Sequence, residues 1–217
     1  MRAKLGSKHS FGTCAILGAS GHGKVIADIA ELIGYSDIHF YDDRWPELTQ
    51  VEHWPVAGDS DSLFMQVADY ANIVVAIGNN AIRLEKYQRL FALGASCLPL
   101  VHPSAVMSRY ASLEDGSVVM AGAVINPFSR IGKACIINTA ATVDHDCVLA
   151  DGVHISPGAH LAGGVCVGEH SWIGIGSQIK QLIRIGNQVI VGAGSTVIHD
   201  IPDFQTVVGT PAVIISH

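Results

Sequence analysis

The chain has 217 residues, of which 49% are hydrophobic and only 15% are charged, and its mean hydropathy is +0.36. This composition excludes intrinsic disorder, and the length leaves room for one large or two small domains. The formal net charge is −6 and no run of lysine or arginine occurs, so we expect neither nucleic acid nor an anionic membrane surface as a partner.

Two further features bear on the cellular setting. No apolar stretch reaches the ~18 residues that a membrane-spanning helix needs. The five cysteines are odd in number and scattered along the chain, with no Cys-x-x-Cys pair. Reduced thiols in a cytoplasmic protein are the expectation from this pattern.

Residues 13–100 have the pattern of a small Rossmann-like α/β domain. A glycine-rich turn at Gly18–Gly23 separates the first expected strand from the first expected helix. Strands are predicted at Cys14–Leu17, Ile38–Tyr41 and Ile73–Ile77, and helices at Lys24–Ile33, Asp59–Asp69 and Ala81–Leu93. Because strands alternate with helices, we expect a parallel sheet with ligands at the carboxyl ends of its strands.

Residues 101–213 repeat with a period of six. From Leu113 to Val197, fifteen positions in steps of six are all aliphatic, and from Ser117 to Ile201 the position four residues later is always small or aliphatic. Neither a helix (period 3.6) nor an ordinary strand (period 2.0) has this period. Six residues do fit one side of a three-sided prism, a left-handed parallel β-helix with about 18 residues per coil. Such a prism can also be an inert scaffold, although no flat threonine ladder is present to suggest one.

The hexapeptide repeat is typical of the hexapeptide acyltransferase superfamily, and the order of the two halves narrows the resemblance. The segments Gly18-Ala-Ser-Gly-His-Gly-Lys24, Ile77-Gly-Asn-Asn80 and Val208-Gly-Thr-Pro-Ala212 together resemble bacterial sugar acetyltransferases. That family includes UDP-4-amino-sugar and GDP-perosamine N-acetyltransferases and proteins named sialic acid O-acetyltransferases. The resemblance implies acetyl-CoA as co-substrate and a homotrimer with active sites at the subunit boundaries.

Acetyl transfer to an amine needs a base that removes a proton, and histidine suits this task at neutral pH. His145 stands between two carboxylates where the chain leaves one side of the prism, and the family's catalytic histidine has a matching His-acid-Cys segment. We predict His145 as general base and Asp146 as the residue that orients it. Asp144 could replace Asp146 in that role, and the residues alone do not decide between them.

The resemblance also implies the residues around acetyl-CoA. His154 lies nine residues, or half a coil, after the expected base, so it would meet that base across a subunit boundary. We predict that His154, Gly163, Ile175 and Ala193 contact acetyl-CoA, and that Asn138 lies near the sugar amine. Corner packing alone could also explain the small residues among them.

In the first domain, the amides of the helix that follows the glycine turn favour phosphate, and acids at the end of the second strand suit hydroxyls or amides of a nucleotide. The residues predicted to bind a nucleotide-linked sugar are Ser20, Gly21, His22, Asp42, Asp43 and Gly78. Asp42 follows Gly18 by 24 residues, a spacing that also suits NAD. We favour a nucleotide sugar, because hydride chemistry would leave the prism without a purpose.

The function predicted from the sequence is therefore acetyl-CoA-dependent N-acetylation of the 4-amino group of a UDP- or GDP-linked amino-dideoxy sugar. O-acetylation of sialic acid or another sugar is one alternative, and a non-catalytic nucleotide-sugar-binding scaffold is another. His145, His154 and His160 invite comparison with the zinc β-helix carbonic anhydrases, but the acidic neighbours of His145 argue against zinc. No metal is expected.

Overall fold

The computed structural model describes residues 11–215, which form two compact units. The N-terminal unit consists of residues 11–77 and 89–97, and the β-helix unit consists of residues 78–88 and 98–215. Helix α3 (Asn80–Ala92) thus begins in the β-helix unit and ends in the N-terminal unit. Within residues 11–215, none of the helices combines the length and the apolar character that a membrane crossing requires.

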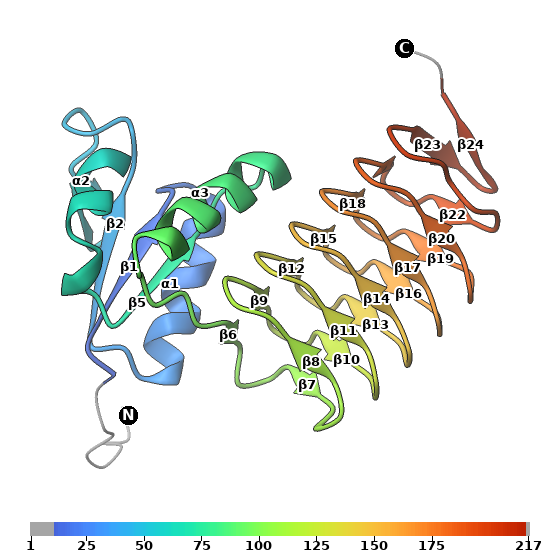
Figure 1. Cartoon of the computed structure of the whole chain (residues 1–217), viewed down its shortest axis with the longest axis horizontal. Coiled ribbons are helices and arrows are strands. Elements are labelled where there is room, and N and C mark those ends of the chain that lie inside the picture. The colour runs from blue at the N-terminus through green and yellow to red at the C-terminus, as the bar shows by residue number, and fades with distance from the viewer. Residues whose placement is uncertain (1–10, 216–217) are drawn as a thin grey trace. The chain divides into compact units, whose positions relative to one another are not determined.

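The N-terminal unit is built on a twisted sheet with the strand order β3-β4-β2-β1-β5 (Figure 1). Its elements are β1 (Thr13–Leu17), α1 (Gly21–Ile33), β2 (Asp37–Tyr41), β3 (Gln50–Val51), β4 (Trp54–Gly58), α2 (Ser60–Met65), a 3-10 turn (Val67–Asp69) and β5 (Asn72–Val75). Strand β1 pairs in parallel with both β2 and β5, and β2 pairs in parallel with β4. The predicted parallel α/β domain is confirmed.

Two local features of this unit differ from the prediction. Helix α1 begins at Gly21, with Ser20 as its N-cap, rather than at Lys24. The short antiparallel pair β3–β4 was not predicted at all. Gly23 lies inside α1, close to the turn that precedes the helix. A Cβ at this position would come within 2.3 Å of the Gly18 carbonyl oxygen, so only glycine allows the helix to pack this closely on the turn.

The β-helix unit is a triangular coil whose three faces are parallel sheets (Figure 1). The first face contains β7 (Val106–Met107), β10 (Val124–Ile125), β13 (Thr142–Val143), β16 (His160–Leu161), β19 (Gln178–Ile179) and β22 (Thr196–Val197). The second face contains β8 (Ser112–Leu113), β11 (Arg130–Ile131), β14 (Val148–Leu149), β17 (Cys166–Val167) and β20 (Arg184–Ile185). The third face contains β6 (Leu100–Val101), β9 (Val118–Val119), β12 (Ile136–Ile137), β15 (His154–Ile155), β18 (Trp172–Ile173), β21 (Ile190–Val191), β23 (Thr206–Gly209) and β24 (Ala212–Ile214). All pairs along the faces are parallel except the terminal pair β23–β24.

Both predicted ladders form the core of the prism. From Val119 to Val197, every residue of the first ladder is at most 3% exposed, and from Ser117 to Ile201 every residue of the second is at most 6% exposed. Where the second ladder has serine, the buried hydroxyl bonds to a neighbouring coil: Ser171 Oγ donates to the Gly186 carbonyl and accepts from the Val189 amide. Burial of the aliphatic ladder stabilises the folded state by about 1.5–3 kcal/mol per fully buried side chain. The serine hydroxyls provide hydrogen-bond partners for backbone groups at the corners.

The corners of the prism require the left-handed backbone conformation at every sixth residue from 116 to 194. Glycine occupies half of these corners, as expected for a positive φ angle. The corners without glycine are Phe128, Ala134, Ala140, Asp146, His170, Leu182 and Gln188. Asp146 (φ 60°) is thus the corner residue that follows His145, and aspartate tolerates this conformation better than most residues.

Candidate active site

His145 lies at the corner between the first and the second face, between β13 and β14. Its side chain is 59% exposed, and its Nδ1 atom lies 2.7 Å from Oδ2 of Asp146. Because a carboxylate only accepts, Nδ1 carries the proton and Nε2 of the neutral ring is left with its lone pair. The free lone pair is what a general base needs.

Asp144 contacts the backbone rather than the imidazole ring. Its Oδ1 atom accepts hydrogen bonds from the His145 backbone amide (2.8 Å) and from Nδ2 of Asn126 (2.8 Å). The His145 amide bond contributes most to the lowering of the Asp144 pKa, so this carboxylate stays ionised. Of the two acids left open by the sequence, Asp146 contacts the imidazole ring and Asp144 accepts from the backbone amide of His145.

The surroundings of His145 increase its basicity. The hydrogen bond to Asp146 raises the pKa of His145 above its usual value, and the negative charge of Asp144 adds to this rise. The neighbouring thiol of Cys147 is buried in the prism core, and burial raises its pKa to about 11. This corner therefore presents a basic imidazole and no activated cysteine.

Gly163 lies on the next coil directly against the imidazole. A Cβ at this position would come within 2.5 Å of Cε1 and 2.6 Å of Nε2 of His145. Only glycine leaves room for the ring in its present position. With Ala162, Gly164 and Leu182, these residues line a cavity of about 420 Å³. The sequence predicted that Gly163 contacts acetyl-CoA. The structure shows that Gly163 lies against the His145 ring.

His154 opens β15 on the third face and is only 8% exposed. Its ring stacks on Trp172 with the centroids 5.4 Å apart, and Nε2 lies 3.1 Å from Nδ2 of Asn138. The Asn138 carbonyl accepts from the Thr139 amide, which fixes the amide so that its nitrogen donates to Nε2.

A second cavity of about 370 Å³ extends from His154 to the corner between the third and the first face. Ile175 and Ala193 line it, together with Trp172 and Ser156. The structure therefore brings three of the four residues predicted at acetyl-CoA together, but places them in a different cavity from His145 and Gly163. One chain therefore has two separate cavities at different corners of the prism.

Trp172 and Ser156 belong to this second cavity and were missed in the sequence. Trp172 Nε1 donates to Ser156 Oγ at 2.6 Å, which fixes the indole beside His154. The signal was available, because Trp172 follows His154 by one 18-residue coil and both residues begin strands of the third face. Within residues 11–215 of one chain, no group of three or more His, Cys, Asp or Glu side chains could hold a metal ion.

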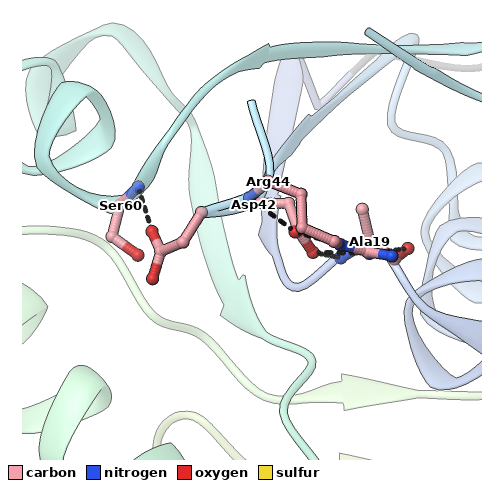
Figure 2. Close-up of polar contacts among 5 residues, drawn as sticks. Ala19, Asp42, Arg44 and Ser60 are labelled. Atoms are coloured by element: carbon pink, nitrogen blue, oxygen red, sulfur yellow. Dashed lines mark hydrogen bonds and ion pairs between the residues drawn. The ribbon is translucent and has the colours of Figure 1, made fainter. Parts of the chain in front are cut away.

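In the N-terminal unit, Asp42 directly follows β2 and contacts the glycine-rich turn (Figure 2). Its Oδ2 atom accepts from the Ala19 amide (2.8 Å), and Arg44 Nε donates to Oδ1 (2.7 Å). Arg44 also donates through Nη2 to the Ala19 carbonyl (2.9 Å), and the bond from Arg44 lowers the pKa of Asp42 to about 2. Arg44 was not predicted, and it adds a cation to the carboxyl ends of β1 and β2.

The other predicted residues of this unit differ in how strongly the fold needs them. Asp43 Oδ1 accepts from the Ser60 amide at 3.0 Å, so this acid ties β2 to the start of α2 (Figure 2). Ser20 forms no side-chain cap on α1, and a Cβ at Gly21 would meet nothing within 4 Å. The exposed start of α1 therefore contains a glycine that packing does not require. His22 lies in the same first turn.

Gly78 belongs to the β-helix unit, just before α3. A Cβ at Gly78 would also meet nothing within 4 Å, and its φ angle is not positive. Packing within the chain therefore does not explain the glycine at this position.

Comparison with known proteins finds matches over nearly the whole chain. Residues 13–90 match the family of PglD N-terminal domains. The acetyltransferase domain of PglB from Neisseria gonorrhoeae FA1090, solved in complex with acetyl coenzyme A, is 44% identical with a TM-score of 0.90, over 94% of this chain and 98% of that one. PerB from Caulobacter crescentus, solved in complex with CoA and GDP-perosamine, is 37% identical with a TM-score of 0.87, over 97% of this chain and 100% of that one.

A GDP-perosamine N-acetyltransferase from Escherichia coli O157:H7 is 31% identical over 120 residues, which is 55% of this chain and 54% of that protein. The chain thus spans about half the length of this curated relative. The prism is the fold of the hexapeptide-repeat acyltransferase superfamily. Since the similarity to the two solved structures extends over nearly the whole chain, the protein belongs to the bacterial sugar acetyltransferase family of that superfamily.

Proposed function

We propose that this protein transfers the acetyl group of acetyl-CoA to the 4-amino group of a nucleotide-linked amino-dideoxy sugar, for the synthesis of a surface or glycoprotein glycan. The observation that carries the proposal is the His145–Asp146 pair, held at a prism corner in a chain that is 37% identical to a protein solved with CoA and GDP-perosamine. Acetyl-CoA is a substrate in this scheme, and no metal takes part in it.

The reaction is direct transfer within a ternary complex. The lone pair of the neutral amine attacks the thioester carbon, and Nε2 of His145 takes the proton that the nitrogen loses. The tetrahedral intermediate then collapses, the C–S bond breaks, and the thiolate of CoA receives the proton from the imidazolium. Asp146 stabilises the imidazolium between these two steps. No acyl-enzyme is required, because the thiol of Cys147 is buried and protonated.

The acceptor half of the site belongs to the glycine-rich turn and to Gly78. In this proposal the amides at the start of α1, from Ser20 to His22, bind phosphate, and Asp42 and Asp43 stand beside the nucleoside. Arg44 pairs with Asp42 and can also neutralise a phosphate. We retain the division into a nucleotide-sugar domain (13–100) and an acetyltransferase domain (101–213) as part of this proposal.

The active site is completed by a second copy of the chain in a homotrimer. His145 and the cavity of His154 lie at different corners of one prism, so one acetyl-CoA would use the first corner of one subunit and the second corner of its neighbour. Ile175 and Ala193 then contact the pantetheine arm, and Asn138 and His154 lie on the far side of the boundary from His145. The free cysteines in the described part of the chain suit a cytoplasmic enzyme.

Release of free CoA thiol from acetyl-CoA tests this function. UDP- and GDP-linked 4-amino-4,6-dideoxy sugars and free sialic acid are supplied in parallel to the purified protein. Rapid release with one of the nucleotide-linked amines supports the proposal and identifies the nucleotide. Release with sialic acid alone would assign O-acetylation, and no release with any acceptor would contradict an acetyltransferase for these sugars and favour a binding scaffold.

A further inference from the structure

Arg83, in the second turn of α3, is one of the most deeply buried large side chains of the protein, at 1% exposure. Its guanidinium donates to the carbonyl oxygens of Ala134 (2.7 Å) and Gly152 (2.9 Å), which are successive corner residues of the prism. It also donates to the Gly78 carbonyl (3.2 Å) and to Oδ1 of Asn80 (2.9 Å). One side chain therefore joins two coils of the prism to the segment before α3.

Asn80 extends this connection to a third coil. Its Nδ2 atom donates to the carbonyl oxygens of His170 (2.9 Å) and Ser171 (3.2 Å). Ala134, Gly152 and His170 follow one another at intervals of 18 residues, so the Gly78–Asn80 segment is held against three coils in succession. All of these residues belong to the β-helix unit, which also contains His145.

The chemistry of arginine explains why this position is not simply apolar. Burial lowers the pKa of Arg83 to about 10, so the guanidinium is still charged at neutral pH. A buried charge is costly unless it is fully hydrogen-bonded, and a planar fork with five donors can reach acceptors in several directions at once. Lysine has neither the width nor the planarity to bond two corner carbonyls and the Gly78 segment together.

The segment that Arg83 holds is close to the second cavity. Asn79 and Asn80 line a space of about 230 Å³ together with Trp172 and Ile190, and the latter two also line the cavity of His154. Gly78 is the predicted acceptor-binding residue whose glycine packing does not explain. A displacement of this segment would thus move an acceptor contact while leaving the prism corners in place.

We propose that Arg83 is a positioning residue, which fixes the Gly78–Asn80 segment on the β-helix and so determines where that segment meets the nucleotide-linked sugar. The inference rests on the proposed function for its substrate. Arg83 itself does not touch the reacting atoms. None of the hydrogen bonds described above goes from Arg83 to His145 or His154, so we expect its loss to affect the acceptor more than the donor.

Arg83→Met and Arg83→Lys test this proposal. A misplacement of about 1 Å at a positioning group can cost about 10²-fold in rate. We expect kcat/KM for the nucleotide-linked 4-amino sugar that the wild-type protein uses to fall about 10- to 100-fold in both variants. KM for acetyl-CoA stays within about twofold. Arg89→Met is the matched control, because Arg89 lies on the same helix but over the Phe64 ring, and it should change neither constant.

Hydrogen exchange of the amides in residues 78–83 gives a readout that does not need activity. Exchange should be faster in both Arg83 variants than in the wild-type protein, with the amides of residues 142–149 unchanged. If Arg83→Met does not fold, Arg83→Lys and Asn80→Ala decide the question, because each removes only part of the connection.

The outcomes separate this inference from the proposed function. An unchanged acceptor kcat/KM in folded Arg83 variants overturns the inference alone, and so does an equal rise of both KM values, which would show a general structural role. A wild-type protein that acetylates no acceptor overturns the proposed function and, with it, the role of Arg83 in acceptor binding. The exchange experiment then shows whether Arg83 holds the segment at all.

Discussion

The two carboxylates beside His145 have separate tasks because of the backbone between them. The positive φ of Asp146 turns its side chain back toward the imidazole, whereas Asp144 lies before the corner and bonds the His145 amide. The sequence suggested both acids but could not separate them, since the corner conformation is visible only in the fold.

Replacing the base itself should show its share of catalysis. His145→Ala is expected to lower kcat by about 10²- to 10⁴-fold, the usual contribution of a positioned general base. KM for acetyl-CoA should change little, since the imidazole side chain is exposed and the prism core does not depend on it. Steady-state kinetics with acetyl-CoA varied would check this, and full activity in the variant would remove His145 from the mechanism.

Asp146→Asn should shift the pH dependence. Asp146 is the first cause of the raised pKa of His145, so its loss lowers that pKa. The base works only when unprotonated, so activity rises with pH through this pKa. The acidic limb of the kcat–pH profile should therefore move to lower pH in the variant, with a lower plateau because the imidazole is less basic. Asp144→Asn, which leaves the ring contact intact, should move the limb less.

Gly163→Ala should affect catalysis through geometry alone. The added methyl group would occupy the space of Cε1 and Nε2 of His145, so the ring must leave its present position. We expect a loss in kcat of about 10²-fold, comparable with a misplaced catalytic group. The check is kcat together with the midpoint of thermal unfolding, and a variant with wild-type kcat would show that the ring is free to move without consequence.

At the scale of elements, two glycines of helix α1 should respond in opposite ways to replacement by alanine. In Gly23→Ala, the new Cβ would meet the Gly18 carbonyl and the Phe40 ring, which should lower the free energy of unfolding by about 1–3 kcal/mol. Gly21→Ala meets nothing and should stabilise the helix by up to about 1 kcal/mol. Chemical denaturation separates the two variants.

Gly21→Ala nevertheless carries a cost if the start of α1 binds phosphate. In that case KM for the nucleotide-linked sugar should rise about tenfold or more, although the protein becomes no less stable. An unchanged KM would place the phosphate away from Gly21.

The elements differ in how far the sequence could predict them. The prism was predictable to the residue, because Val119 and its successors recur with a period that no other regular structure has. The start of α1 was not, since Gly21 and Gly23 favour a turn locally and the close packing of Gly23 on Gly18 is visible only in the fold. The pair β3–β4 was missed because Gln50–Val51 is too short to show alternation, and Pro55 within β4 is typical of loops.

For the site, the sequence predicted His145, Asp146, His154 and Asn138, and the structure shows that His145 contacts Asp146 and that His154 contacts Asn138. Trp172 was visible only by counting one coil from His154. Arg44 was not visible at all, because its bond to Asp42 depends on how the chain leaves β2 rather than on any spacing. The sequence also did not show which residues share a cavity. Each cavity is lined by residues of successive coils, which lie far apart in the sequence.

At the scale of the whole molecule, the two separate cavities predict complementation between subunits. His145→Ala and His154→Ala chains are mixed and reassembled from denaturant. Any mixed trimer has one boundary at which both histidines are wild type, so about a third of full activity per mixed trimer should return. Each variant reassembled alone is the control. If both histidines served the same subunit, every site would lack one of them and mixing would restore nothing.

Up to β22, the paired strands of the prism are 18 residues apart, and this spacing has a consequence for how such a chain can change in evolution. Duplication or loss of a complete coil leaves every remaining side chain on its original face. The prism can therefore lengthen or shorten in evolution by complete coils. An insertion of a single residue turns every later position away from its place in the ladder. Genetic variation in the length of this half of the chain is therefore restricted to multiples of one coil, or to loops that bulge out at a corner.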